Sequence, residues 1–283
     1  APTGCLRSNG GLGGKHKVGT MGESAMKSFE DITCVRDGAV ATIAINRPDR
    51  LNAFRDLTAT EIHEAIVELD ADPEINAVIL TGTGRAFGAG YDLSRIAPDE
   101  IPALDQVLEL YFNPMIRAIR RSRLPFIAQV NGPCAGAAVG FALAADIVLA
   151  ARSAYFYEPF NGIALVPDAG NTLFLPRAVG RLRALPMMLL GDRISAEQAH
   201  AWGLVWQLCE DDQLADAARA MAARIAALAP QAVAGTKQLV SAASDFDMDE
   251  QLDLERDLQG DAGRSPAMKA EIAAFFARKN RKS

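Results

Sequence analysis

The sequence predicts an α/β fold with a mostly parallel sheet, followed by a helical C-terminal region. Two observations support this fold class. Short apolar strands alternate with helical segments from about residue 32 to residue 150, which is the pattern of right-handed βαβ units. After residue 170 the pattern is mostly helical. The chain has 283 residues, which is enough for one large domain with a helical appendage.

The first two strands are expected to form a hairpin. Residues 32–35 and 39–45 are apolar segments, and Asp37-Gly38 between them is a strong hairpin signal. The Asn-Arg-Pro sequence at residues 46–48 ends the second strand. This antiparallel pair therefore begins the sheet.

The remaining elements follow from hydrophobic spacing and from small-residue segments. Ile62, Ile66 and Leu69 recur at helical spacing within residues 57–70. The further expected elements are a strand over 77–80, a Gly-rich loop over 83–91, a helix over 101–121, a strand over 126–130, a helix over 135–145, a strand over 147–150 and a strand over 204–208.

Composition and charge exclude several classes of function. Hydrophobic residues make up 49% and charged residues 23% of the chain, as is usual for globular proteins. The net charge of −6 (29 basic minus 35 acidic residues) lacks the basic excess of a nucleic-acid-binding protein. No apolar run approaches the ~20 residues needed to cross a bilayer. We therefore expect a cytoplasmic protein with neither a nucleic acid nor a membrane as its partner.

Neither a metal site nor a phosphate-binding loop is expected. The four cysteines and three histidines show no metal-binding spacing, and the cysteines are expected to be reduced thiols. Gly13-Gly14-Lys15 resembles part of a phosphate loop, but no strand precedes it and no Ser or Thr follows. Residues 1–28 lack a hydrophobic period and are expected to be a disordered leader.

Three glycine-containing segments at strand ends, residues 85–93, 131–140 and 165–172, are candidates for chemistry. Small residues let the main chain approach a ligand, and two backbone donors from separate loops can form an oxyanion hole. A carboxylate in an apolar pocket has a raised pKa, which suits proton transfer. Simpler explanations stay open, because glycine-rich turns are often only turns and Asp168 could merely cap the helix near Gly170.

These segments resemble the crotonase (enoyl-CoA hydratase/isomerase) superfamily. The matching motifs, in the family's order, are INRPDRLNAF (45–54), RAFGAGYDL (85–93), VNGPCAGAAVGFALAADIVLAA (130–151), LVPDAGNTLFLPRAVG (165–180) and ISAEQAHAWGLV (194–205). The resemblance extends from about Phe29 to Lys279. It implies a crotonase-type spiral of ββα units over 29–220 and a C-terminal helical region over 221–283 that joins subunits into trimers or hexamers.

The resemblance also implies an acyl-CoA substrate, whose CoA moiety makes a separate cofactor unnecessary. Tyr91 and Ala137 would supply the two backbone N–H groups that polarise the thioester carbonyl, and Asp168 would be the acid/base. Ala137 replaces a glycine that is common in the family. The resemblance further implies that CoA is bound by Arg50, Leu51, Ala89, Asp92 and Leu93, with Phe275 and Lys279 from the same or a neighbouring subunit.

One departure from the family pattern narrows the function. Typical enoyl-CoA hydratases use two glutamates to hold water, and the corresponding positions here are Gly140 and Phe160. Glu158 is offset from them and is expected to face elsewhere, so Asp168 remains as the aligned carboxylate. One carboxylate suits an isomerase, because the same group removes and returns a proton. Within the superfamily, the segments YFNPMIR (111–117), SAEQAHAWGLVWQ (195–207) and QLDLERDLQGDAGRS (251–265), with Asp168 and the apolar Phe160, most resemble bacterial epoxyphenylacetyl-CoA isomerases of phenylacetate degradation.

Two other functions stay open at this point. A hydratase could use Glu158 or a bound water in place of the missing pair, and a non-catalytic CoA-binding protein could support an enzyme complex. A dehalogenase fits poorly, because relatives with that activity need a histidine roughly where Arg117 stands. The sequence identifies neither the acyl group nor the choice between trimer and hexamer.

Overall fold

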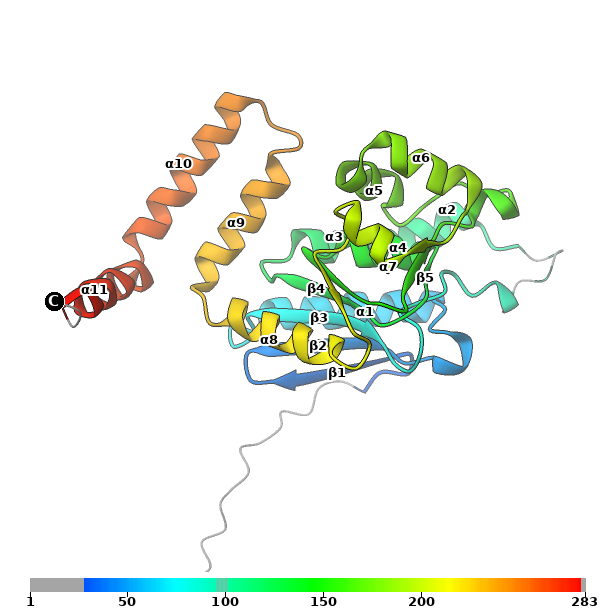
Figure 1. Cartoon of the computed structure of the whole chain (residues 1–283), viewed down its shortest axis with the longest axis horizontal. Helices are drawn as coiled ribbons and strands as arrows, with labels where there is room; N and C mark the ends of the chain where they lie inside the picture. Colours follow the sequence, from blue (N-terminus) through cyan, green and yellow to red (C-terminus); the bar gives the residue numbers. More distant parts are fainter. Residues whose placement is uncertain (1–27, 96, 98, 100, 281–283) are drawn as a thin grey trace, which may run out of the picture.

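The computed structural model describes residues 28–280, without residues 96, 98 and 100 (Figure 1). The leader expected over residues 1–28 thus lies outside the described residues, apart from its last residue. The side chains of residues 279 and 280 are also not described. Within the described part, no helix is both long enough and apolar enough to span a membrane.

A six-stranded sheet forms the centre of the molecule. Its strands are β1 (Ile32–Asp37), β2 (Val40–Ile45), β3 (Ala77–Gly82), β4 (Phe126–Val130), β6 (Ile147–Ala151) and β9 (Gln207–Cys209), in the order β1-β2-β3-β4-β6-β9. Only β1 and β2 are antiparallel; every other neighbouring pair is parallel. Asp37 pairs with Val40, so the predicted hairpin is confirmed with Gly38 and Ala39 as its two-residue turn.

A second, three-stranded sheet consists of strands that the sequence did not predict. They are β5 (Cys134–Ala135), β7 (Tyr155–Tyr157) and β8 (Ile194–Ser195). β5 and β7 are parallel, and β7 and β8 are antiparallel. Segments of two or three residues are too short to show a hydrophobic period, which explains why the sequence did not reveal them. The strand expected over 204–208 also differs, because pairing with β6 begins only at Gln207.

Helices surround both sheets. They are α1 (Asp56–Ala71), α2 (Leu104–Val107), α3 (Asn113–Arg121), α4 (Ala137–Ala144), α5 (Asn171–Val179), α6 (Arg181–Leu190), α7 (Ala196–Ala201), α8 (Leu214–Ala226), α9 (Pro230–Ala242), α10 (Met248–Arg264) and α11 (Pro266–Asn280). The helix expected over 101–121 starts only at Leu104, and a π-helical turn over Leu108–Phe112 interrupts it. π-Helical turns often occur at functional sites.

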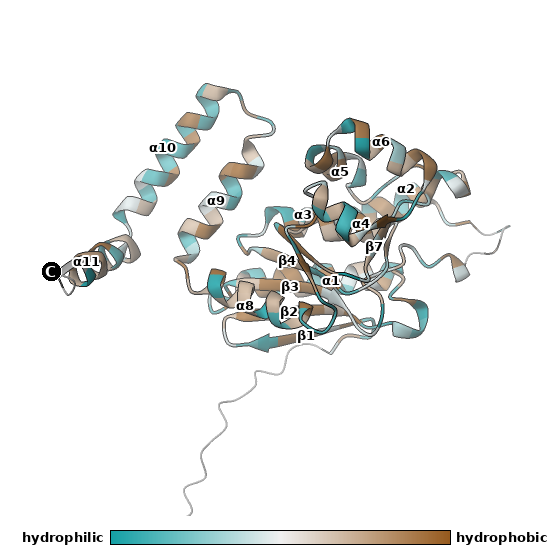
Figure 2. Ribbon diagram, in the orientation of Figure 1, coloured by the Kyte–Doolittle hydropathy of each residue, from teal (hydrophilic) through white to brown (hydrophobic). Residues whose placement is uncertain are grey.

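The core lies between the six-stranded sheet and its helices. Every residue of β3 is buried, and α8 packs across β2, β3, β4 and β6. All eight residues of α4 are buried as well. Their small side chains let neighbouring segments approach this helix closely, which matters for the site below. Figure 2 shows the apolar colour concentrated on β2, β3 and β4.

The last three helices extend away from the sheet as an arm (Figure 1). Helices α9 and α10 contain no buried residue, and the polar and apolar colours alternate along them in Figure 2. Lys237 of α9 attaches the arm to the core: its Nζ donates to the carbonyls of Ile119 (2.9 Å) and Leu124 (2.7 Å) and pairs with Asp146 (3.0 Å). The domain boundary expected at residue 220 falls inside α8.

Candidate active site

A cavity of about 280 Å³ contains the three residues expected to be catalytic. Tyr91, Ala137 and Asp168 all line its wall. The rest of the lining is apolar and comes from the loop around Leu93, from residues 101–112 and from the segment after β7. A concave, mostly apolar pocket with a few polar groups is the usual form of a small-molecule site. This cavity is therefore the candidate active site.

Two backbone segments run side by side along one wall of this cavity. Gly88 and Cys134 form a parallel bridge, and the Ala135 N–H donates to the Gly88 carbonyl at 2.9 Å. Gly90 and Gly136 both have positive φ angles, of 82° and 55°. A Cβ on Gly90 would lie 3.0 Å from the Ala135 oxygen, so the close approach leaves no room for a side chain there. A Cβ on Gly90 would also lie 3.6 Å from the Ala137 nitrogen, so the residue before Tyr91 is close to the Ala137 amide.

Among the described residues, the N–H groups of Tyr91 and Ala137 have no backbone acceptor. Their neighbours are engaged: the Asp92 N–H donates to the Phe54 carbonyl (2.8 Å), and the Gly136 N–H donates to the Tyr157 carbonyl (2.8 Å). Tyr91 donates no backbone hydrogen bond to any residue in the described part of the chain. Ala137 is the first residue of α4, where a helix leaves its N–H groups without an internal acceptor.

The side chain of Tyr91 is held by its own contacts. Its hydroxyl donates to Asp56 Oδ1 at 3.1 Å, and its ring packs edge-on against Phe112 with 5.8 Å between centroids. Burial, reinforced by the charge of Asp56, raises the pKa of Tyr91 to about 12. The phenol therefore stays protonated near neutral pH, and its hydroxyl is engaged by Asp56.

Asp168 is a half-buried carboxylate at the cavity wall. Burial raises its pKa to about 6. Oδ1 is buried and has no hydrogen-bond partner among the described residues. No side chain caps the start of α5, where Gly170 is the N-cap, so the alternative in which Asp168 only caps a helix is wrong. Instead its carbonyl accepts the Asn171 N–H (2.9 Å), which leaves the carboxylate available for chemistry.

Glu158 is a second carboxyl close to Asp168. It is completely buried, and neither of its oxygens has a partner in the described part of the chain. Burial raises the pKa of Glu158 to about 9, and the charge of Asp168 acts in the same direction. Glu158 does not belong to the cavity lining. Sequence reasoning missed this coupling, although a glutamate within an otherwise apolar segment was a usable signal.

The two positions that the sequence resemblance matches to the hydratase glutamates, Gly140 and Phe160, carry no carboxylate. Phe160 is buried and lines the cavity with its ring. Gly140 lies in α4, and a Cβ on it would come 2.2 Å from the carbonyl oxygen of Ala169. The main chain next to Asp168 therefore occupies the space that a side chain at position 140 would need.

The residues expected to bind CoA are only partly brought together. Arg50 and Asp92 line a small polar pocket with Arg47 and Ser94. The pKa of Asp92 is lowered: burial alone would raise it, but hydrogen bonds from Ser94 and Arg47 outweigh burial. Arg47 Nη2 lies 2.8 Å from Asp92 Oδ2, so the charge of Asp92 is already paired. Arg50 is exposed and has no ion pair with a described residue, which leaves it as the available cation.

The other expected CoA contacts are spread over two places. Ala89 and Leu93 line the main cavity, and Leu51 follows the turn at Arg50 with a left-handed φ of 50°. Phe275 is exposed on α11, and Figure 1 shows this helix at the end of the arm, away from α4 and β5. Lys279 lies in the same helix, but its side chain is outside the described part. Within one chain, Phe275 lines neither the main cavity nor the polar pocket at Arg50.

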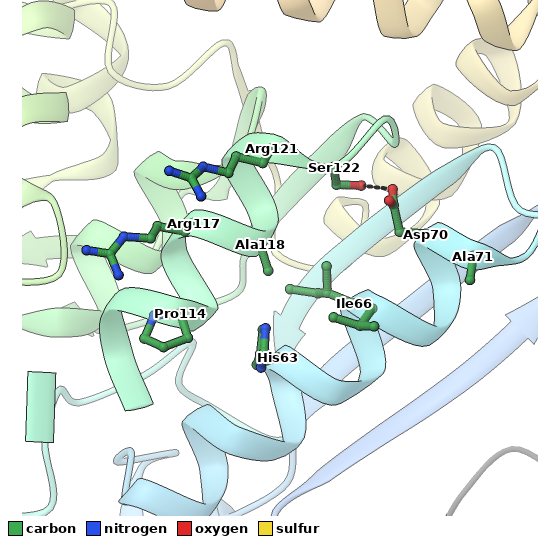
Figure 3. A pocket seen from close by; sticks show the side chains of 10 residues that line it. His63, Ile66, Asp70, Ala71, Pro114, Arg117, Ala118, Arg121 and Ser122 are labelled. Atoms are coloured by element: carbon green, nitrogen blue, oxygen red, sulfur yellow. Dashed lines mark hydrogen bonds between the residues drawn. The ribbon is translucent and has the colours of Figure 1, made fainter. Parts of the chain in front are cut away.

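A larger, open groove of about 580 Å³ lies between α1 and α3 (Figure 3). His63, Arg117 and Arg121 line it, and Ser122 donates to Asp70 at one end. The groove contains none of the expected catalytic residues, so its size does not make it the active site. Arg117 belongs to this groove and is absent from the lining of the main cavity. In the described ranges, no group of His, Cys, Asp or Glu has the arrangement of a metal site.

Comparison with known proteins agrees with this geometry. The model of the enoyl-CoA hydratase/isomerase family matches residues 36–282. The chain belongs to this family. The chain is 41% identical over 244 residues to the 1,2-epoxyphenylacetyl-CoA isomerase of Escherichia coli (strain K12), covering 85% of this chain and 93% of that protein. It is 40% identical over 250 residues to a "Probable enoyl-CoA hydratase" of Rhodobacter capsulatus, covering 88% of this chain and 96% of that protein.

Solved structures of the family confirm the predicted fold class. An enoyl-CoA hydratase from Polaromonas sp. JS666 superposes with a TM-score of 0.82 at 32% identity, covering 87% of this chain and 97% of that one. Pseudomonas aeruginosa DspI superposes with a TM-score of 0.85 at 31% identity, covering 90% and 97%. The enoyl-CoA hydratase/isomerase relatives carry names of both activities, so family membership alone leaves the reaction open.

The buried Glu158 generates a prediction about stability. Its folded pKa of about 9 lies above the ordinary 4.5, so its contribution to stability is present below about pH 4.5 and is lost as pH rises to about 9. Glu158→Gln should therefore increase the free energy of unfolding more at pH 8 than at pH 5.5, by about 3 kcal/mol. Urea unfolding at both pH values measures this, with the exposed Glu255→Gln as the control. An equal effect at the two pH values would contradict a buried, neutral Glu158.

Proposed function

We propose that the protein is an acyl-CoA isomerase in which Asp168 is the single acid/base. The observation that carries the proposal is the composition of one cavity. Asp168 shares it with the two free amides of Tyr91 and Ala137, while Gly140 and Phe160 stand at the positions of the hydratase glutamates. Two preorganised donors and one carboxylate match the needs of proton transfer through an enolate.

The proposed reaction moves one proton and leaves the atoms of the substrate otherwise unchanged. The Asp168 carboxylate removes a proton from the carbon α or γ to the thioester carbonyl, and the released electron pair moves onto the carbonyl oxygen. The Tyr91 and Ala137 N–H groups stabilise that oxygen, an effect of about 3 kcal/mol per donor in other enzymes. Asp168 then returns the proton at the other carbon, so no second acid is needed.

We further propose that the substrate is a 3-enoyl-CoA or an epoxyphenylacetyl-CoA, which would place the enzyme in phenylacetate degradation. The E. coli relative is named for the second of these substrates. The apolar cavity, with the rings of Phe112 and Phe160 in its wall, suits a compact aromatic or cyclic acyl group. Because CoA is part of the substrate, no separate cofactor takes part. We place the reaction in the cytoplasm, with neither a nucleic acid nor a membrane as a partner.

The role of Asp168 can be tested by Asp168→Asn. Because a base must be ionised, kcat/KM of the wild type should rise as pH increases through about 6, the pKa of Asp168. The variant should lose at least a hundredfold in isomerase turnover, a loss within the usual range for a general acid/base. Asp105→Asn, on the exposed side of α2, is the matched control. Activity of Asp168→Asn within about tenfold of the wild type, under roughly 1.4 kcal/mol, would overturn the assignment.

A hydratase is the second candidate, and Glu158 is the observation that favours it. This carboxyl is close enough to Asp168 for the charge of one to raise the pKa of the other. A screen of 3-enoyl-, 2-enoyl- and epoxyphenylacetyl-CoA with product identification separates the candidates. We expect isomerised products and slow hydration of crotonyl-CoA. Fast hydration that Glu158→Gln abolishes would favour the hydratase, and tight binding of acyl-CoA without turnover of any substrate would favour a non-catalytic binding protein.

We also propose that the chain forms a homotrimer or a hexamer. Helices α9 and α10 bury no residue within one chain, although Leu252, Met248 and other apolar side chains lie on them. A neighbouring copy would cover this apolar surface. It would also bring Phe275 and Lys279 to the CoA of another subunit, beside Arg50.

Sedimentation of the full chain should therefore give the mass of three or six copies. Phe275→Ala should raise KM for acyl-CoA several-fold with little change in kcat, because the ring would contact CoA far from the reacting atoms. The exposed Met268→Ala, on the same helix, serves as the control. A monomer at micromolar concentration that turns over acyl-CoA would disprove the assembly.

A further inference from the structure

The peptide unit between Gly136 and Ala137 has an unusual partner. Its N–H is the Ala137 amide that we propose for the oxyanion hole. Its carbonyl, on Gly136, accepts a hydrogen bond from Asn171 Nδ2 at 3.1 Å. Gly136 itself has φ 55° and ψ −127°, a conformation that side-chain-bearing residues avoid. The Val139 N–H at the start of α4 donates to the same oxygen (2.9 Å), so the helix and Asn171 together hold this peptide plane in place.

The Asn171 hydrogen bond, which comes from outside the loop and α4, helps to fix the direction of the Ala137 N–H. In a planar trans peptide, the carbonyl and the N–H of the same unit point in opposite directions. A donor held on the Gly136 oxygen therefore aims the Ala137 N–H away from Asn171. Because Ala137 lines the cavity, the amide can face the substrate there. A hydrogen bond to the carbonyl also polarises the unit, which makes its N–H a stronger donor.

We infer that Asn171 is a positioning residue that aims and polarises the oxyanion donor of Ala137. This inference rests on the proposed function, because it assigns a task to one of the two proposed amides. The role differs from that of Tyr91, Ala137 and Asp168, since Asn171 acts through the main chain and is absent from the cavity lining.

Asn171 is well placed to couple the two halves of the site. It is the first residue of α5 and is completely buried. Its own N–H donates to the Asp168 carbonyl (2.9 Å), so one residue connects the loop of the base to the peptide of the donor. Its Oδ1 has no partner among the described residues. The side-chain amide of Asn171 therefore makes a hydrogen bond only through its NH2 group, which donates to the Gly136 carbonyl.

Asn171→Leu tests the inference, because leucine has a similar size and lacks the donor while the backbone N–H to Asp168 is kept. We expect kcat to fall about tenfold or more with less than a threefold change in KM. The decisive readout is spectroscopic. A chromophoric cinnamoyl-CoA absorbs at longer wavelength when its carbonyl is polarised, and bound to the wild type it should shift to the red. The shift should shrink in Asn171→Leu and persist in Asp168→Asn.

The controls separate this inference from the proposed function. Thr172→Val, one residue along α5 on its exposed side, should leave kcat and the red shift unchanged. If Asn171→Leu does not fold, Asn171→Ser provides the same readout, because serine is too short to reach Gly136. An undiminished red shift in the variant overturns the role of Asn171 even if isomerase activity is present. A wild type that binds the thioester without any shift overturns both the oxyanion hole and the inference.

Discussion

The close parallel approach of two backbone segments, 88–91 and 134–137, is the constraint on which the rest of the site depends. It brings the main-chain amides of Tyr91 and Ala137 to one cavity wall. A Cβ on Gly88 would lie 2.8 Å from the Cβ of Ala138, and one on Gly90 would lie 3.0 Å from the Ala135 oxygen. Glycine at these positions is thus a packing requirement. The side chain of Tyr91, in contrast, is turned to other contacts and leaves its amide available.

Burial then gives the two acidic groups different states at neutral pH. Desolvation raises the pKa of Asp168 to about 6, so this carboxylate is mostly ionised and still basic enough to remove a proton. Glu158 lies deeper, and its pKa of about 9 keeps it neutral. An enolate forms more easily beside a neutral carboxyl than beside a second anion. The same buried surroundings therefore favour the chemistry that we propose and avoid a charge that would oppose it.

Much of this arrangement could be predicted from the sequence, and the exceptions have physical reasons. The hairpin, α1 and strands β3, β4 and β6 follow from hydrophobic spacing, and the three cavity residues came from motif resemblance. Strands β5, β7 and β8 were missed because they are too short to have a period. The coupling of Glu158 to Asp168 and the bond from Asn171 to Gly136 link residues 10 and 35 positions apart, and spacing does not encode such contacts.

Gly140 and Phe160, the positions matched by resemblance to the hydratase glutamates, lack a carboxylate for different structural reasons. Phe160 faces the cavity, so its ring replaces one side chain with another and mainly removes polarity. At position 140, the main chain of Ala169 fills the space, 2.2 Å from where a Cβ would stand. Ala169 itself has a left-handed φ of 49°, which holds this backbone against α4. The turn that presents Asp168 thus leaves no room for any side chain at position 140, so a carboxylate there would require this backbone to move.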